Sequence, residues 1–195
     1  MKLTEKDSKV IRISTRGVNS YLIRGEKSIL IDTGYPGSGR TIMAKLILEG
    51  IDPGEISLIL ITHGHNDHFG SAAELKERLG VPVAVHSMDA EYLRKGTNPP
   101  IHATSTTGRI LKFLLSQTGT STVPPLEPDI LIEGETSLEK YGVEGVVIPT
   151  PGHTPGSISV LLSSGEGLVG DLIMGLGLWT RIPSYPIFAD DLKQV

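Results

Sequence analysis

Cysteine is absent from this chain of 195 residues. Its absence excludes a disulfide-bonded scaffold and every reaction that needs a thiolate nucleophile. It also removes the thiolate as a metal ligand, so any metal site has to be built from histidine and carboxylate side chains.

Long apolar runs and clusters of basic residues are missing as well. No stretch approaches the ~18 apolar residues that a membrane-spanning helix needs, and the polar start 1–7 lacks the apolar core of a signal peptide. The 22 acidic and 18 basic residues give a formal charge of −4 without a Lys/Arg cluster, so charge offers no footprint for nucleic acid. We therefore expect a cytoplasmic protein whose partner is a small-molecule substrate, with no nucleic-acid or membrane partner. The sequence does not indicate an oligomeric state.

Length and composition are those of one globular domain. A chain of 195 residues can bury a sizeable core but is too short for a second full domain. Its 38% hydrophobic and 21% charged residues are ordinary values. We expect a single domain over residues 1–195.

Periodicity and turn residues predict strands first, then helices that alternate with buried strands, then strands again. The predicted strands cover 10–14, 18–24, 27–32, 57–62, 81–86, 130–133, 146–148, 157–163 and 168–172. The predicted helices cover 41–49, 71–79, 89–95 and 109–117, with the polar segment 96–108 as a candidate lid. This order predicts sheets between helical layers.

Three of the six histidines lie in one hexapeptide together with an aspartate. The hexapeptide follows the apolar run 57–62, and its Gly64 and Asn66 tolerate unusual backbone angles that direct several side chains inward. Neutral imidazoles and carboxylates are the ligands that zinc prefers when thiolates are unavailable. A lone histidine is usually a surface residue, but this density predicts a metal site. Its candidate ligands are His63, His65, Asp67 and His68.

Two further residues fit the same site. His153 is a lone histidine in the Pro/Gly-rich turn 149–157, between two predicted strands. Asp171 ends an apolar strand, where an unpaired carboxylate is costly to bury. Each residue alone is equally well explained as part of a turn, but next to the hexapeptide a ligand role is favoured for both.

Together these residues resemble the motifs of the metallo-β-lactamase superfamily, in its glyoxalase II-like branch of small metal-dependent hydrolases. The order and spacing agree over residues 18–175, and the matching positions are Asp32 in 31–34, the block 63–68, His153 in 151–157 and Asp171 after Gly170. The resemblance implies an α+β fold, a four-layer αββα sandwich with the site along the edge between two β-sheets.

The resemblance also implies the role of each residue. Two zinc ions are expected, although the same ligand types accept iron or manganese. His63, His65 and His153 would hold the first ion, Asp67 and His68 the second, and Asp171 would bridge the two. Asp32 would not bind a metal itself but would orient the loop that carries the ligands. A metal-bound hydroxide, oriented by the catalytic Asp67, would attack a small thioester, lactone or ester.

One feature of the family is missing from the chain. Members with a full two-metal site usually supply another histidine from a loop near the C-terminus, but none lies beyond position 153 here. His86 is predicted to be structural, and His102 to lie in the lid, where a substrate contact is favoured over a ligand role. Either Asp67, His68 and Asp171 hold the second ion with water, or the chain stops short of the closing elements of the fold. We expect the latter, because 188–195 resembles the start of a helix.

Two other functions stay open. A persulfide dioxygenase-like oxidoreductase would use one iron held by two histidines and an aspartate, and a non-catalytic metal-binding module would have an incomplete second site. A β-lactamase is less expected, because the chain has neither a secretory signal nor a cysteine ligand. The substrate pocket is expected within 87–119 and 176–188.

Overall fold

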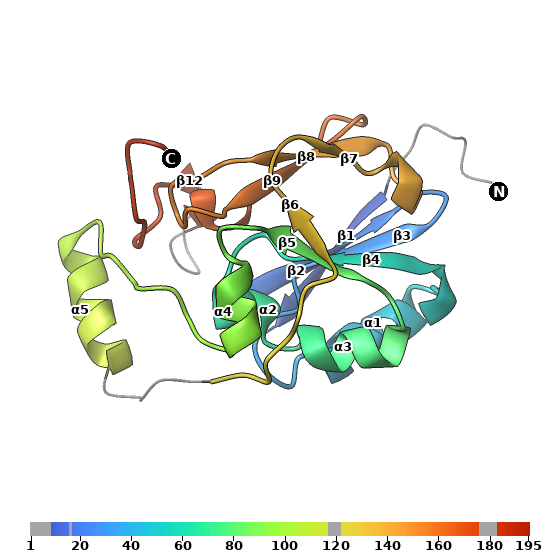
Figure 1. The fold of residues 1–195 in the computed structure, drawn as a ribbon, viewed down its shortest axis with the longest axis horizontal. Coiled ribbons are helices and arrows are strands. Elements are labelled where there is room, and N and C mark those ends of the chain that lie inside the picture. Colours follow the sequence, from blue (N-terminus) through green and yellow to red (C-terminus); the bar gives the residue numbers. More distant parts are fainter. Residues whose placement is uncertain (1–8, 16, 117–121, 176–182) are drawn as a thin grey trace.

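The computed structural model describes residues 9–15, 17–116, 122–175 and 183–195. Two β-sheets and one layer of helices make up its body (Figure 1). No helix of the described residues is long and apolar enough to cross a membrane. The cytoplasmic location expected from composition stays a prediction.

The larger sheet has six strands in the order β1-β2-β3-β4-β5-β6. Its first three strands are antiparallel neighbours, and β3 to β6 run parallel. The strands are β1 (Lys9–Thr15), β2 (Val18–Arg24), β3 (Ser28–Ile31), β4 (Ile56–Leu60), β5 (Val83–His86) and β6 (Ile130–Ile132). The parallel strands end at a common edge, so the residues that follow them meet there.

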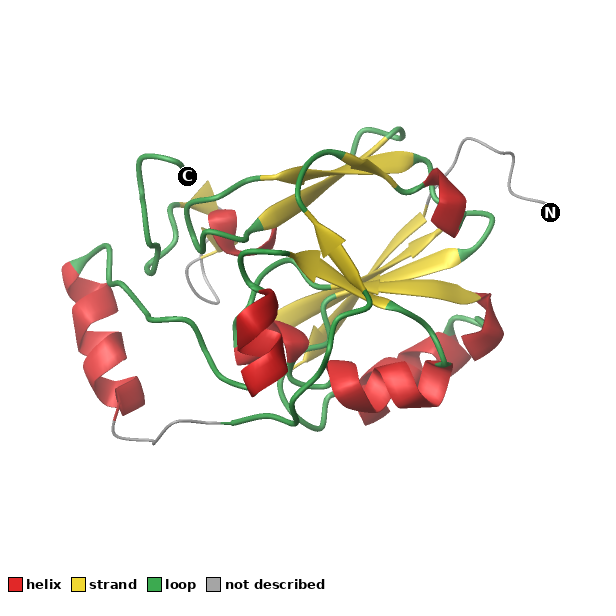
Figure 2. Cartoon of the chain, in the orientation of Figure 1, coloured by secondary structure: helices red, strands yellow, loops and turns green. Residues whose placement is uncertain are grey.

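The smaller sheet is antiparallel, in the order β10-β9-β8-β7. Its strands are β7 (Thr136–Ser137), β8 (Gly145–Pro149), β9 (Ile158–Leu162) and β10 (Gly167–Leu168). A separate two-stranded ribbon pairs β11 (Met174–Gly175) with β12 (Pro183–Ser184). Figure 2 shows the smaller sheet stacked on one face of the larger, with the helices on the opposite face.

The helices are short. They are α1 (Gly39–Leu48), α2 (Asn66–Phe69), α3 (Ala72–Leu79), α4 (Ala90–Lys95) and α5 (Thr106–Ser116), with 3-10 turns η1 (Pro53–Glu55), η2 (Glu139–Tyr141) and η3 (Gly170–Leu172). Helices α1, α3 and α4 contribute apolar side chains to one buried cluster with the larger sheet. The described residues therefore form the helix–sheet–sheet layers of the expected sandwich, and they place no α-helix on the outer face of the smaller sheet.

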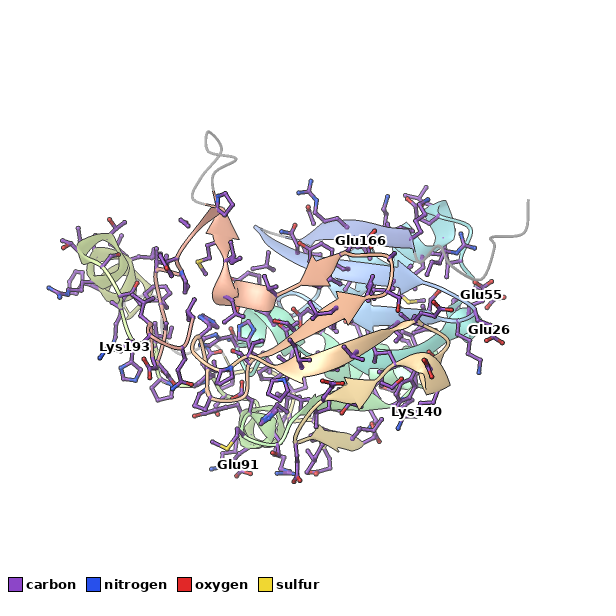
Figure 3. All side chains as sticks on the ribbon, turned by 90° about the horizontal axis from the view of Figure 1, so that it is seen from above. Glu26, Glu55, Glu91, Lys140, Glu166 and Lys193 are labelled. Atoms are coloured by element: carbon purple, nitrogen blue, oxygen red, sulfur yellow. The ribbon has the colours of Figure 1, made fainter. Side chains whose placement is uncertain are left out.

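Both faces of the larger sheet are buried, which explains its unbroken apolar strands. Along β4, Leu58 and Leu60 pack toward the smaller sheet, whereas Ile59 packs toward the helices. Of the described charged residues, all but Asp32 and Asp89 are at least partly exposed. Figure 3 labels six of them, all exposed: Glu26, Glu55, Glu91, Lys140, Glu166 and Lys193. The prediction of a central strand with both faces covered is confirmed.

Two predicted elements are wrong. The strand expected at 168–172 ends at Leu168, and the chain then turns through η3, where Gly170 has a φ of +53°. The helix start expected at 188–195 is a strap that ends in a single turn at 192–194. Its backbone N–H groups at 189, 190 and 191 donate to the carbonyls of His102, His153 and Gly152, so they are not available to a helix.

Candidate metal centre

The hexapeptide of histidines lies where β4 meets α2. After Leu60 the chain turns, so that His63 and His65 lie in the turn and His68 lies in α2. All three imidazoles are buried. Neither Gly64 nor Asn66 has the positive φ that the sequence led us to expect, since Asn66 begins the helix.

Asp32 follows β3, the parallel neighbour of β4, and lies behind this turn. It adopts a left-handed backbone with φ of +57°, the only described non-glycine residue with a positive φ. Its Oδ1 accepts a hydrogen bond from the Thr62 backbone N–H at 2.8 Å. Its Oδ2 accepts from the Thr62 hydroxyl and from His68 Nδ1, both at 2.8 Å. A strained backbone held by three buried hydrogen bonds is a feature of functional sites.

These hydrogen bonds determine which nitrogen of His63 carries the proton. The Thr62 hydroxyl donates its only hydrogen to Asp32, so its oxygen accepts from His63 Nδ1 at 3.0 Å. With the proton on Nδ1, His63 Nε2 keeps a free lone pair. His68 also donates through Nδ1, to Asp32 itself.

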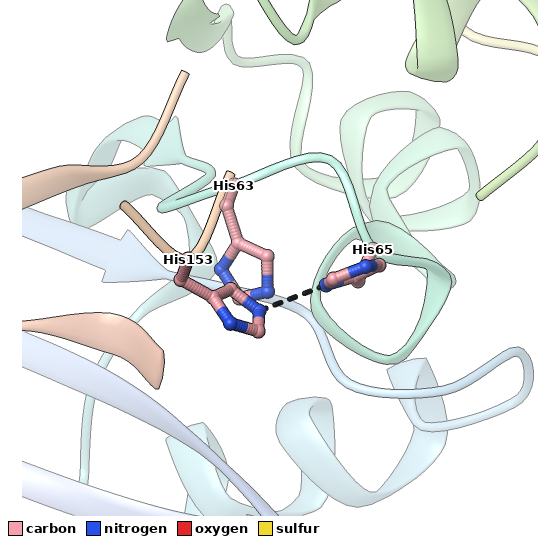
Figure 4. A group of neighbouring side chains, drawn as sticks. All are labelled: His63, His65 and His153. Atoms are coloured by element: carbon pink, nitrogen blue, oxygen red, sulfur yellow. Dashed lines mark hydrogen bonds between the residues drawn. The ribbon is translucent and has the colours of Figure 1, made fainter. Parts of the chain in front are cut away.

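His153 reaches the site from the turn between β8 and β9. Its Nδ1 lies 2.8 Å from the carbonyl oxygen of Phe188, which can only accept, so Nδ1 carries the proton. Its Nε2 lone pair therefore faces His65 Nδ1 at 3.0 Å (Figure 4). The strap at the C-terminal end of the chain thus selects the tautomer of His153.

The structure brings five of the six sequence-predicted ligand positions into two adjoining groups, and Asp67 belongs to neither. Ligand atoms within 4.8 Å of one another come from His63, His65 and His153 in one group, and from His63, His68 and Asp171 in the other. Asp171 Oδ1 lies 3.4 Å from His68 Nε2, and Asp171 Oδ2 lies 3.8 Å from His153 Nε2. Its carboxylate therefore lies between the groups. Asp67 Oδ2 is 4.0 Å from His68 Nε2.

Unpaired nitrogens test whether these residues fit a metal. Nε2 of His63, His65 and His68 is buried and has no hydrogen-bond partner among the described residues. Leaving such an atom unsatisfied costs about 1–3 kcal/mol, and only the Asp171 carboxylate, 3.4 Å from His68 Nε2, lies near one of them, so these buried nitrogens need an explanation. A metal ion held by imidazole lone pairs supplies it, and the donor set fits zinc.

Burial keeps two of the imidazoles in the form that binds metal. Desolvation lowers the pKa of His65 to about 3 and places the pKa of His63 well below its usual range. His68 behaves differently. Burial also disfavours its charged form, but the carboxylates of Asp171 and Asp32 outweigh burial and raise its pKa well above the usual range. Against the cost of burial, His68 in turn lowers the pKa of Asp171 to about 2.

The two other histidines lie outside these groups. His86 Nδ1 accepts a hydrogen bond from the Met88 backbone N–H, which agrees with the structural role predicted for it. His102 is 60% exposed and lies 3.7 Å from Asp190. Neither is near enough to the cluster to complete a metal site.

A cavity of about 360 Å³ opens beside Asp67, His68 and Asp171. Its walls come from the start of β2, from the segment 168–175 and from Ile187. Of the stretches 87–119 and 176–188, which were expected to line the substrate pocket, only Ile187 lines this cavity, while 117–119 and 176–182 lie outside the described residues. The segment 168–175, which leaves the smaller sheet at Leu168, lines the cavity because η3 turns it toward the candidate ligands Asp67 and His68.

Sequence reasoning missed Thr62 and Asp89. Both are buried, and both hydrogen-bond to the turns that carry the histidines. Asp89 was assigned only to the start of a helix. The available signal was an acidic residue soon after a buried parallel strand, the same position that Asp32 occupies after β3.

Comparisons with known proteins agree with this geometry. Residues 13–184 match the family model described as the metallo-beta-lactamase superfamily. The chain is 35% identical over 163 residues to a probable metallo-hydrolase of Methanocaldococcus jannaschii, covering 83% of this chain and 70% of that one. It is 31% identical over 127 residues to a hydroxyacylglutathione hydrolase of Shewanella pealeana, covering 65% of this chain and 36% of the relative.

A solved structure agrees as well. The beta-lactamase from Chitinophaga pinensis superimposes with a TM-score of 0.63 at 28% identity, covering 80% of this chain. This chain spans 54% of that protein's length. The likeness therefore extends to the fold of the part compared.

Proposed function

Because this chain belongs to the metallo-beta-lactamase superfamily, we propose that it is a metal-dependent hydrolase of a small thioester, lactone or ester. The observation that carries the proposal is the set of buried, unpaired imidazole nitrogens beside an open cavity. Such nitrogens bind a metal, and the cavity gives a substrate access to it.

The ligand set proposed here has two parts. His63, His65 and His153 would hold one ion, and Asp67 and His68 a second, with Asp171 shared between them. Zinc fits this donor set, while iron and manganese are accepted by the same residue types. A bound ion would supply a Lewis acid that lowers the pKa of water and polarises a substrate carbonyl.

Asp67 is the residue that we propose handles the proton. It lines the cavity, its side chain is 24% exposed, and it lies beside His68. Burial, reinforced by the nearby charge of Asp171, raises the pKa of Asp67 above that of an ordinary aspartate, although His68 acts in the opposite direction. A carboxylate with a raised pKa is better suited to take a proton at Oδ and deliver it to a leaving group.

The cavity supports a small substrate with little charge. Its volume of about 360 Å³ is within the range of small-molecule sites. The described lining contains no lysine or arginine, and its apolar walls are Val18, Ile31, Leu168, Ile173, Met174 and Ile187. We propose a small molecule as the only partner. A thioester draws additional support from the likeness to the hydroxyacylglutathione hydrolase.

An oxidoreductase is the second candidate. The group formed by His63, His68 and Asp171 has the composition of two histidines and one carboxylate, which is a common ligand set for non-haem iron. A persulfide dioxygenase-like activity would fit that group with a single iron. Elemental analysis separates the candidates, because one iron per chain favours the dioxygenase and two zinc per chain favour the hydrolase.

The test of the proposal is a substrate panel run on the metal-loaded protein. The panel contains a thioester, a lactone, an ester, a phosphodiester and a β-lactam, and His65→Ala is compared with the parent chain. We expect turnover of the first three classes. Removing a residue that hydrogen-bonds to a metal ligand typically lowers activity ~10–100-fold, and His65→Ala, which removes a proposed ligand itself, should lower turnover by more than that.

His102→Ala is the matched control, because this histidine is 60% exposed, lies outside both ligand groups and does not line the cavity, where the substrate contact expected for it would be made. It should leave turnover unchanged. Hydrolysis that is indifferent to His65→Ala would exclude the metal mechanism. Stoichiometric zinc without turnover of any substrate would favour the non-catalytic module.

A further inference from the structure

Asp89 is a fully buried acidic residue between β5 and α4. Its exposed fraction is 0%, and it directly precedes the first residue of α4. A carboxylate is removed from water at high cost unless hydrogen bonds replace its hydration. The hydrogen-bond donors around Asp89 therefore show which segments its buried carboxylate holds together.

Three donors saturate the Asp89 carboxylate. Oδ2 accepts from the backbone N–H of Gly64 and from the hydroxyl of Thr154, both at 2.7 Å. Oδ1 accepts from the backbone N–H of Gly156 at 3.0 Å. Hydrogen bonds to an ionised acceptor are roughly twice as strong as neutral ones.

These donors belong to the two turns that carry the histidine cluster. Gly64 lies between His63 and His65, and Thr154 directly follows His153. The three imidazoles that gather within 4.8 Å of one another therefore depend on turns that one carboxylate joins. Asp89 itself contacts the backbone of the turns, and its bonds to them leave the imidazoles free.

The glycines of both motifs reflect this close approach. A Cβ at Gly156 would lie 2.5 Å from Cγ and Oδ1 of Asp89, and a Cβ at Gly64 would lie 3.0 Å from Cδ2 of Tyr92 and 3.2 Å from Asp89 Oδ2. Neither glycine has a positive φ, so the space is needed for the carboxylate and not for an unusual backbone. Asp89 thus explains the glycine at 156 and, together with Tyr92, the glycine at 64.

We propose that Asp89 is a positioning residue that holds the His63–His65 turn and the His153 turn at the separation which a metal ion shared by the three imidazoles requires. The inference rests on the metal centre of the proposed function and is independent of the substrate. Under this proposal, loss of the Asp89 carboxylate lowers zinc affinity in addition to any effect on the stability of the fold.

The experiment measures zinc affinity by competition with a chromophoric chelator, and the absorption spectrum of the Co²⁺-loaded protein. Asp89→Asn keeps the size of the side chain, but its NH₂ group cannot accept a hydrogen bond. If the amide oxygen takes the place of Oδ2, the NH₂ faces the backbone N–H of Gly156, and if it takes the place of Oδ1, the NH₂ faces the backbone N–H of Gly64. We expect zinc affinity at the three-histidine site to fall ~10–100-fold, with altered Co²⁺ bands. Thr154→Val removes one of the three bonds and should cause a smaller loss of affinity in the same direction.

Asp129→Asn is the matched control. The carboxylate of Asp129 also accepts a backbone N–H, that of Val83 at 2.8 Å, but its bonds do not reach the ligand turns. Its zinc affinity and Co²⁺ spectrum should equal those of the parent chain, even where its melting temperature falls.

An Asp89→Asn protein with parental zinc affinity and Co²⁺ bands overturns the inference, whatever its melting temperature. If that variant does not fold, Thr154→Val decides, and unchanged affinity there overturns the inference as well. A parent chain that binds neither metal at the cluster would overturn the proposed function and this inference together, whereas equal binding by parent and variant overturns this inference alone.

Discussion

Asp32 links two of the proposed ligands through their protons. It accepts directly from His68 Nδ1, and it occupies the Thr62 hydroxyl so that Thr62 accepts from His63 Nδ1. Both imidazoles consequently engage Nδ1 in these bonds and leave Nε2 as the possible ligand atom. A single carboxylate thus selects the tautomers of two residues that belong to different parts of the hexapeptide.

Asp32→Asn tests this role without changing the backbone preference, because asparagine also tolerates the left-handed region. The amide would donate to His68 Nδ1 and move the proton to Nε2, the atom that faces Asp171. We expect affinity for the second zinc ion to fall ~10–100-fold, with a smaller change at the first ion. Calorimetric titration of the metal-free protein measures both. Two ions bound at parental affinity would contradict the prediction.

The depressed pKa values of His63 and His65 predict how the metal-free protein responds to acid. In the unfolded chain both histidines titrate near their ordinary pKa of 6.5, whereas in the folded chain they stay neutral. Below pH 6.5 the unfolded state therefore binds more protons, so stability falls as the pH drops toward 3. For His65 alone the free energy of unfolding should fall by about 3 kcal/mol between pH 6.5 and pH 4.

Urea denaturation of the chelator-treated protein at several pH values provides the measurement. The ion pair of His68 with Asp171 does not offset the loss in this window, because the pKa of His68 lies above it and that of Asp171, about 2, lies below it. His65→Ala should show a shallower dependence on pH. A free energy that stays level from pH 6.5 to pH 4 would contradict the assignment of buried, neutral imidazoles.

At the scale of elements, the parallel strands of the larger sheet position the residues of the site. β3, β4 and β5 end at one edge of the larger sheet, and Asp32, the histidine turn and Asp89 follow them in that order. The short helix α2 then carries Asp67 and His68, and it ends at Gly70 against the loop of Pro36. The position of α2 therefore depends on how closely its last turn approaches that loop.

Gly70→Ala should displace this helix. An added Cβ would lie 2.6 Å from Pro36 Cδ and would also meet the carbonyl oxygen of Asn66. The backbone at Gly70 is helical, so the effect is one of space alone. We expect a loss of about 1–3 kcal/mol in the free energy of unfolding, together with weaker binding of the ion held by Asp67 and His68.

Gly134→Ala is the comparison, because a Cβ there has no neighbour within 4 Å and the φ of Gly134 is not positive. Its stability should match that of the parent chain in urea denaturation. Equal stabilities for Gly70→Ala and Gly134→Ala would contradict the prediction, because they would show that the loop of Pro36 moves aside without loss of stability.

At the scale of the molecule, the site lies where the two sheets meet. The backbone N–H of Ile158, at the start of β9, donates to the carbonyl of Thr62 at 2.9 Å. Below this bond, side chains from both sheets form one continuous apolar layer. The histidine turn of one sheet and the His153 turn of the other are held together by this layer.

Ile158→Ala should therefore weaken both the fold and the site. Ile158 is 1% exposed, and removing such a side chain costs roughly 2–5 kcal/mol. Leu161, on the same strand, is 42% exposed, so Leu161→Ala should change stability by no more than ~0.5 kcal/mol. Urea denaturation of the two metal-free variants makes the comparison. Similar losses for both would argue against the packed layer between the sheets.

The sequence by itself determined the chemistry of the candidate ligands and most of the elements. The hexapeptide is local, so its histidines and aspartate are visible without a fold, and the apolar run before it needs only the rule for buried strands. His153 and Asp171 were found because turn residues and an apolar strand mark their positions. The fold class followed from the resemblance that these motifs carry, and the superfamily match supports it.

The tertiary structure alone decided which imidazole nitrogens are free, where the cavity opens and what joins the two turns. Each depends on partners far apart in the chain, such as Asp32 with His68, Phe188 with His153 and Asp89 with Gly156. The same holds for the strand expected at 168–172 and the helix expected at 188–195, because hydrogen bonds to distant carbonyls and a left-handed glycine overrode local propensity there. Local patterns record what a residue can bind, whereas the partner that it meets is set by the packing of the whole chain.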